Sequence, residues 1–131
     1  MANVPAWATT PRLGIGALST GNSALDGTGT LVSVLSAGAS GTKIERLIVK
    51  ALGTTTLGMV RWFINNGAGQ HRLFKEVAVT ANTASSSNPT FEGLVDLSGP
   101  DGTLVLPAGY SLEASTEKTE NFVAIAVGGD L

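Results

Sequence analysis

Residues 58–80, GMVRWFIN-NGAGQ-HRLFKEVAVT, decide the fold class. The pattern on both sides of the central NGAGQ has a period of two, which is typical of β-strands with one buried face. Between the two halves, Asn66-Gly67 supplies the positive φ angles that a tight reversal requires. We therefore expect a β-hairpin with strands at 58–65 and 71–80.

The period-two pattern continues outward from this hairpin. Further strands are predicted at 30–37, 43–52, 91–97, 103–106, 110–116 and 121–128. In 43–52, one face carries Leu47, Val49 and Ala51, and the other carries Arg46 and Lys50. The first of these faces is expected in the core and the second in water. About eight short strands predict an all-β, antiparallel β-sandwich of the jelly-roll kind.

Two segments lie outside these strands. The small polar residues of 81–89 predict a surface loop, at which the chain crosses from one sheet to the other. Residues 1–27 are rich in glycine and nearly uncharged, and no helical or strand period recurs in them. We expect an extended N-terminal arm over 1–27, ordered by a neighbouring surface, and the sandwich domain over 28–131. A disordered tail is the alternative for this segment.

Apolar residues of the arm are the predicted partner-binding residues, because a segment with so few of them cannot close a core of its own. They are Trp7, Leu13, Ile15, Leu18 and Leu25. The glycines between them would let the backbone follow a groove closely. Such an arm would dock on a partner surface that covers these side chains.

Composition excludes several classes of function. Eight Lys and Arg against ten Asp and Glu give a net charge of −2, which does not produce the basic field of a nucleic-acid-binding protein. The chain has no cysteine, so disulfides, thiol catalysis and Cys-ligated zinc are excluded. No apolar run reaches the length of a membrane span, and the start lacks the pattern of a signal peptide. We expect assembly in the cytoplasm of a cell, with no membrane or nucleic-acid partner.

Candidate reactive residues are few and isolated. His71 is the single histidine, and it has no second histidine with which to hold a metal. Glu92 and Asp96 share one face of a predicted strand, and a wet strand face explains them as well as a pair of catalytic acids does. The serines of 85–87 lack a base and an orienting acid. We therefore predict no catalytic residues, no cofactor and no metal, and thus no enzyme.

Aromatic residues flank the hairpin. Trp62, Phe63 and Phe74 would suit a platform on which a sugar stacks, although cross-strand packing is the commoner reason for aromatics in a hairpin. Both interpretations stay open from the sequence, and packing is the preferred one.

Three blocks carry a resemblance to a known class of protein: KIERLIVKALGTTTLGMVRWFINN from Lys43, LVLPAGYSLEAST from Leu104, and the terminal FVAIAVGGDL. They resemble the capsid cement, or decoration, proteins of tailed bacteriophages, small jelly-roll proteins. The resemblance covers about residues 28–131 and rests on strand texture, so no functional residue is carried over from it.

The resemblance implies a structural virion protein on the outer capsid surface. Such a protein would bind the major capsid protein, stabilise contacts between capsid subunits, and form a homo-oligomer, a dimer or a trimer. Physical arguments agree, because a protein that coats a lattice needs a rigid sandwich and contact surfaces more than a reactive pocket. The alternative is a binding module of a phage tail or fibre that recognises a surface glycan, with Trp62, Phe74 and the 81–89 loop as its site.

Overall fold

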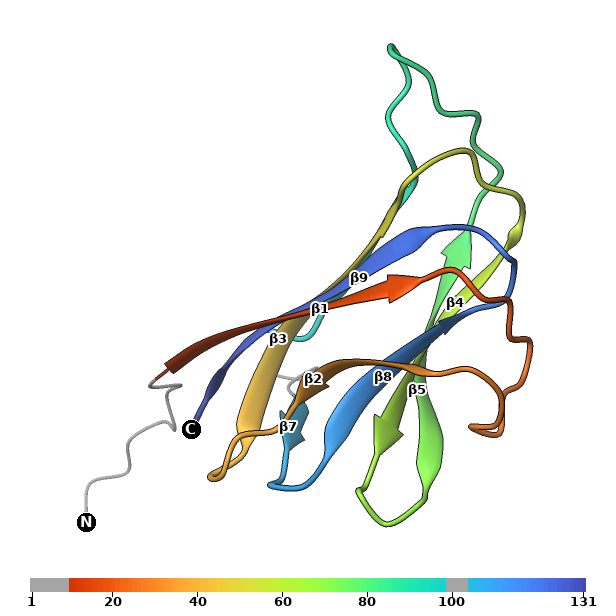
Figure 1. The fold of residues 1–131 in the computed structure, drawn as a ribbon. Helices are drawn as coiled ribbons and strands as arrows, with labels where there is room; N and C mark the ends of the chain where they lie inside the picture. The colour runs from red at the N-terminus through yellow and green to blue at the C-terminus, as the bar shows by residue number, and fades with distance from the viewer. Residues whose placement is uncertain (1–9, 99–103) are drawn as a thin grey trace.

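Two antiparallel β-sheets pack face to face in the computed structural model, which describes residues 10–98 and 104–131 (Figure 1). Sheet A has the strand order β1-β9-β3-β6, with β7 also paired to β3, and sheet B has the order β2-β8-β4-β5. The strands are β1 (Thr10–Leu18), β2 (Val32–Ser36), β3 (Thr42–Ala51), β4 (Gly58–Asn65), β5 (His71–Val79), β6 (Glu92–Asp96), β7 (Leu104–Leu106), β8 (Ser111–Thr116) and β9 (Phe122–Asp130). Over these residues, no helix is long and apolar enough to span a membrane.

The core lies between the sheets and follows the predicted alternation. Leu47, Val49 and Ala51 of β3 are buried in it, as expected for the apolar face of that strand. The bulkiest contribution from sheet B is Trp62, which is fully buried against the same cluster. Sheet A faces it with Phe122, at the start of β9. The two inner faces therefore share one continuous hydrophobic core.

Most of the predicted elements are confirmed. The hairpin formed by β4 and β5 turns at 66–70, where Gly67 and Gly69 have positive φ angles. The 81–89 loop links β5 of sheet B to β6 of sheet A, so it is the predicted crossover. The eight strands expected from the sequence correspond to β2 through β9. The all-β sandwich is therefore the fold of this chain.

The structure differs from the expected arm at residues 10–18. These residues form β1, which pairs with β9 over its whole length, from Thr10 opposite Asp130 to Leu18 opposite Phe122. Leu18 is 2% exposed and belongs to the core. An extended segment thus does find a surface that orders it, but that surface is the sheet of the same chain. Strand β1 is part of the sandwich, so the boundary at residue 27 does not separate an arm from a domain.

Two glycines of β1 allow it to lie close to β2 at the edge of the sandwich. Gly14 and Gly16 are buried and face inward. A Cβ on Gly14 would collide with the Val34 carbonyl and lie 2.8 Å from the Leu35 Cβ. A Cβ on Gly16 would lie 3.0 Å from the Val32 side chain. Glycine lowers the strand propensity of this segment, and the same two glycines let β1 pack closely against β2.

A polar network fastens the ends of β1, β3 and β9 together. Arg12 Nη1 donates hydrogen bonds to both carboxylate oxygens of Asp130, at 2.8 and 3.1 Å. The Thr42 hydroxyl donates to Asp130 Oδ1 at 2.7 Å, and it accepts a bond from the Gly38 N–H. These contacts, with the Thr42 hydroxyl first and then Arg12, hold the pKa of Asp130 below its ordinary value of 3.8. The carboxylate thus joins residues far apart in the sequence.

We expect Gly14→Ala to destabilise the fold by about 1–3 kcal/mol, because its methyl group has no room beside the β2 backbone. Gly53→Ala is the matched control, since nothing lies within 4 Å of a Cβ there. Denaturant unfolding of both variants measures the difference. Equal stability of the two variants would show that β1 does not approach β2 as described.

Asp130→Asn should lower the unfolding temperature by a few degrees at pH 7, because the amide keeps the geometry but loses the charge that faces Arg12. A depressed pKa contributes stability above the unfolded value near 3.8, and this contribution disappears as the pH falls through the lower folded value. The gap between wild type and variant should therefore close in acid. Thermal unfolding from pH 7 to pH 2, with Glu45→Gln as the charge control, tests this. A gap that is unchanged at pH 2 would contradict it.

Candidate interaction surface

An apolar row crosses the outer face of sheet A. Ile15 of β1 lies opposite Ile125 of β9. Ile125 lies opposite Ile48 of β3, which in turn lies opposite Leu94 of β6. Directly opposite residues point to the same face of a sheet, so these four side chains form one line across the paired strands. Ile15 is 63% exposed and Leu94 is 58% exposed, so both ends of the row face solvent.

The rows beside it widen the patch along β1 and β9. Leu13, 61% exposed, lies opposite Val127, and Ala17 lies opposite Val123. We call the whole set the apolar face: Leu13, Ile15, Ala17, Ile48, Leu94, Val123, Ile125 and Val127. An antiparallel sheet that meets water normally carries polar side chains on its wet face. A contiguous exposed apolar patch of this kind is a candidate interaction surface.

The charged residues of this sheet face lie opposite residues of the other charge on the neighbouring strand. Lys50 Nζ lies 4.0 Å from Glu92 Oε1, on the neighbouring strand. Arg46 is directly opposite Asp96. The pKa of Asp96 is lowered first by the Ser98 hydroxyl and backbone N–H and further by the nearby charge of Arg46. Two cations on β3 thus balance two anions on β6, and the face as a whole is neutral.

Sheet B has an outer face of the opposite character. The Arg61 guanidinium, nearly buried, donates from Nε to Glu76 at 2.9 Å and from Nη2 to Glu117 at 3.1 Å. The segment between β1 and β2 reaches this sheet, where the Asn22 N–H donates to the Thr116 carbonyl at 2.7 Å. One sandwich therefore presents a polar outer face on sheet B, held by ion pairs, and on sheet A an outer face whose charged residues flank an exposed apolar patch.

His71 is part of the polar face. Its Nδ1 lies 2.6 Å from Glu113 Oε1, and the Asn65 amide donates to the other oxygen of the same carboxylate at 3.4 Å. A Cβ on Gly27 would collide with the His71 backbone, so the β1–β2 segment passes directly beside it. These contacts give His71 a structural role in the polar face.

The other candidate reactive residues are also in structural contacts. Glu92 and Asp96 flank Leu94 on β6 and face the cations of β3. The hydroxyls of Ser85 and Ser87 contact each other at 3.4 Å in the exposed crossover loop. No group of three or more His, Asp or Glu side chains that could hold a metal occurs within 10–98 and 104–131.

The hairpin aromatics do not form a stacking platform. Trp62 and Phe63 are fully buried, and Phe74 is half-buried and packs against the core. Packing is therefore the correct interpretation of these residues. The glycan site expected from Trp62 and Phe74 under the alternative function is wrong in this respect, because a sugar ring needs an exposed aromatic face.

The predicted partner-binding residues fall into different places. Leu13 and Ile15 are exposed on the apolar face, and Leu25 is 54% exposed in the segment between β1 and β2. Leu18 points into the core, where no partner reaches it. Trp7 lies outside the described residues. The structure thus brings two of the five predicted residues together on one surface.

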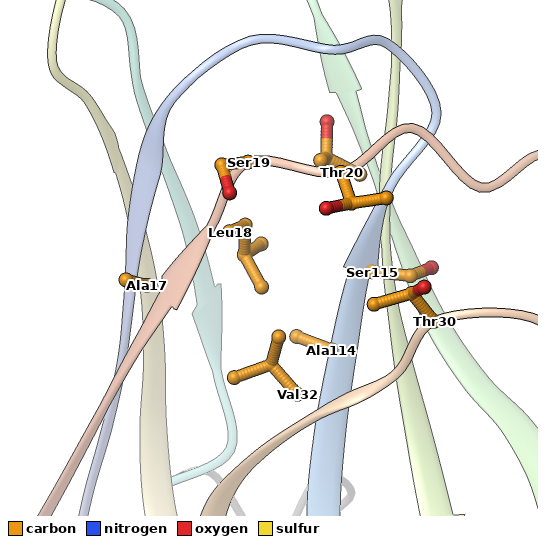
Figure 2. Close-up of a pocket in the computed structure, with 9 residues that line it drawn as sticks. Ala17, Leu18, Ser19, Thr20, Thr30, Val32, Ala114 and Ser115 are labelled. Atoms are coloured by element: carbon orange, nitrogen blue, oxygen red, sulfur yellow. The ribbon is translucent and has the colours of Figure 1, made fainter.

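Two hollows in the surface differ in size and in lining. A crevice of about 30 Å³ opens between the end of β1, the start of β2 and β8. In Figure 2, the side chains of Leu18 and Val32 point toward each other across it. It has room for roughly one water molecule and no ionisable group in its lining. A second, open hollow of about 350 Å³ is lined mainly by apolar residues, with Leu57 and Met59 among them and Glu117 as its one charged group.

Ile48, Leu94 and the outward valines and isoleucine of β9 are not among the residues predicted from the sequence. Their signal was present in 122–127, FVAIAV, which is apolar at every position. A strand with no polar alternation is typical of one covered on both faces. In β3, Ile48 lies between Arg46 and Lys50 on the same face. Those two charged residues led to the prediction that this face lies in water, so the apolar row was not predicted.

Comparison with known proteins supports the fold. No family model and no curated protein match the chain. Among solved structures it is similar to the one described as "Structure of Eiger TNF from S. frugiperda", with 11% sequence identity and a TM-score of 0.50. The match covers 93% of this chain and 95% of that one. At this identity the likeness concerns the fold alone, and the chain is a jelly-roll β-sandwich.

Proposed function

We propose that this chain is a structural virion protein, a capsid cement protein of a tailed bacteriophage. It would bind the outer surface of the capsid, where its partner is the major capsid protein, after assembly in the host cytoplasm. Its action would be to hold neighbouring capsid subunits together. The resemblance in strand texture first suggested this role, and the likeness in fold is compatible with it.

The apolar face is the observation that supports the proposal best. It carries no net charge and spans four strands, and it lies on a sheet fixed by long ladders of hydrogen bonds. Surfaces of this kind recognise other proteins through shape and apolar contact. A cement protein needs such a rigid contact surface, because it must hold its neighbours at fixed distances.

A surface hollow and a loop supply further possible contact surface for a capsid. The open hollow beside Leu57 and the crossover loop at 81–89 lie away from the apolar face and offer further contact surface. A protein with more than one contact surface can bridge two partners, which is what a clamp between capsid subunits requires. The arrangement therefore fits a bridging role.

Co-sedimentation with capsids assembled from the major capsid protein of the same genome tests the function. Wild type should pellet with capsids in a saturable way, at a fixed number of copies per capsid. Leu13→Glu/Ile15→Glu should reduce the bound fraction at least about tenfold, because burying a carboxylate on this face costs several kcal/mol.

Leu52→Glu is the control, since Leu52 is also 61% exposed but lies outside the apolar face. It should bind as the wild type does if the apolar face carries assembly. Failure of the wild type to pellet at saturating concentration would sink the proposed function.

A further inference from the structure

We propose that Asn66, at the tip of the β4–β5 hairpin, is a site of spontaneous covalent modification, and that the side chain of Asn65 sets its rate. The modification converts the Asn66 side-chain amide into a carboxylate through a cyclic succinimide. It uses no enzyme and no cofactor, because the attacking atom is the backbone nitrogen of Gly67, the next residue in the chain. The inference is independent of the proposed function.

The reaction joins two neighbouring residues. The Gly67 nitrogen loses its proton and forms a bond to the Asn66 side-chain carbon Cγ. The bond from Cγ to the amide nitrogen Nδ2 breaks, and Nδ2 takes up that proton and leaves as ammonia. Water then opens the ring at either of its two carbonyl carbons. One opening gives aspartate, and the other gives isoaspartate, in which the backbone runs through the former side chain.

The carbon that is attacked is held in a geometry that favours the reaction. Asn66 Oδ1 accepts a hydrogen bond from the Ala68 N–H at 2.8 Å and another from the Gln70 N–H at 3.2 Å. Negative charge develops on this oxygen when Gly67 attacks Cγ. Backbone N–H groups that already point at such an oxygen stabilise the charge, as an oxyanion hole does. The hydrogen bonds of the turn therefore promote attack on Asn66.

The attacking nitrogen, in contrast, is occupied. The Gly67 N–H donates to Asn65 Oδ1 at 2.8 Å, and this bond must break before the nitrogen can lose its proton and reach Cγ. The Asn65 side chain is itself held, since its Nδ2 donates to Glu113 Oε2 at 3.4 Å. The other oxygen of Glu113 contacts His71. Asn65 is thus a positioning residue that slows ring closure.

Glycine at position 67 is required by the turn. Its φ angle is 75°, and a Cβ there would lie 2.5 Å from the Gly109 carbonyl oxygen. The absence of a side chain also leaves the Gly67 nitrogen unshielded on its way to Cγ. Asn66 is the one asparagine of the sequence that precedes a glycine. The residue that shapes the turn therefore also makes Asn66 the asparagine most open to attack.

Conversion changes the hairpin tip in two ways. Either product carries a negative charge that Asn66 lacks, and it loses the Nδ2 donor that bonds Gln70 Oε1 at 3.0 Å. Isoaspartate also lengthens the backbone and moves the former Oδ1 into the main chain, away from the Ala68 and Gln70 N–H groups. The 66–70 turn should loosen as a result.

Peptide mapping by mass spectrometry of the full chain, incubated in mildly alkaline buffer, tests the proposal. Asn66 should convert first among the asparagines, into a mixture of aspartate and isoaspartate. Asn65→Ala should speed the conversion about fivefold, because loss of one hydrogen bond of ordinary net strength frees the Gly67 nitrogen. Asn65→Ser should restore part of the protection, since a serine hydroxyl can accept from the same N–H. Asn82 is the reference site within every sample.

Hydrogen exchange separates the effect of Asn65 on Gly67 from a general loss of stability. The Gly67 amide should exchange faster in Asn65→Ala, while the Trp62 amide in the centre of β4 and the far-UV circular dichroism spectrum stay as in the wild type. Asn121→Ala is the matched control, since Asn121 is exposed in the turn between β8 and β9. It should leave both the exchange of Gly67 and the conversion of Asn66 unchanged.

Two results would overturn the proposal. One is conversion of Asn66 no faster than that of Asn82 in both the wild type and Asn65→Ala, which would show that the tip is not a modification site. The other is an Asn65→Ala variant whose conversion and Gly67 exchange equal those of the wild type, which would show that Asn65 does not set the rate.

Discussion

The pairing of β1 with β9 is the interaction on which the rest of this structure depends. It runs from Thr10 opposite Asp130 to Leu18 opposite Phe122, without a bulge. Because side chains alternate along a strand, this one register sends Leu18 into the core and Leu13 and Ile15 outward. A slip of one residue would bring Leu13 and Ile15 inward against β2, where a Cβ at Gly14 already finds no room. The register is therefore fixed by close packing as well as by hydrogen bonds.

The same pairing gives the sandwich two unlike outer faces. On sheet B, Nε and Nη2 of the Arg61 guanidinium and both oxygens of the Glu113 carboxylate have hydrogen-bond partners in the chain, whereas Arg61 Nη1 is buried without one among the described residues. On sheet A, the strands of the ladder line up Ile15, Ile125 and Ile48 in one row. The polar face is thus held largely by contacts within the chain, while the apolar face leaves large hydrophobic side chains exposed to water.

The parts of the fold that the sequence predicts are those that depend on residues close together in the chain. The β4–β5 hairpin follows from an alternating pattern and Asn66-Gly67, and its strand bounds are nearly those expected. Strand β1 was not predicted, because Gly14 and Gly16 lower the strand propensity of this segment. Their role becomes visible with the β2 backbone beside them. Of the apolar face, only Leu13 and Ile15 were predicted, because joining them to Leu94 requires the registers of three strand pairs.

The most direct test of the central claim, that the apolar face is covered by protein in the native assembly, is methyl NMR of the full chain bound to capsomers of the major capsid protein, with a soluble paramagnetic agent. The account predicts that the methyl groups of Ile15 and Leu94 are shielded from the agent, although both side chains are more than half exposed in a single copy. The Leu57 methyl groups, outside the face, should relax strongly. Relaxation of Ile15 and Leu94 as strong as that of Leu57 would contradict the account.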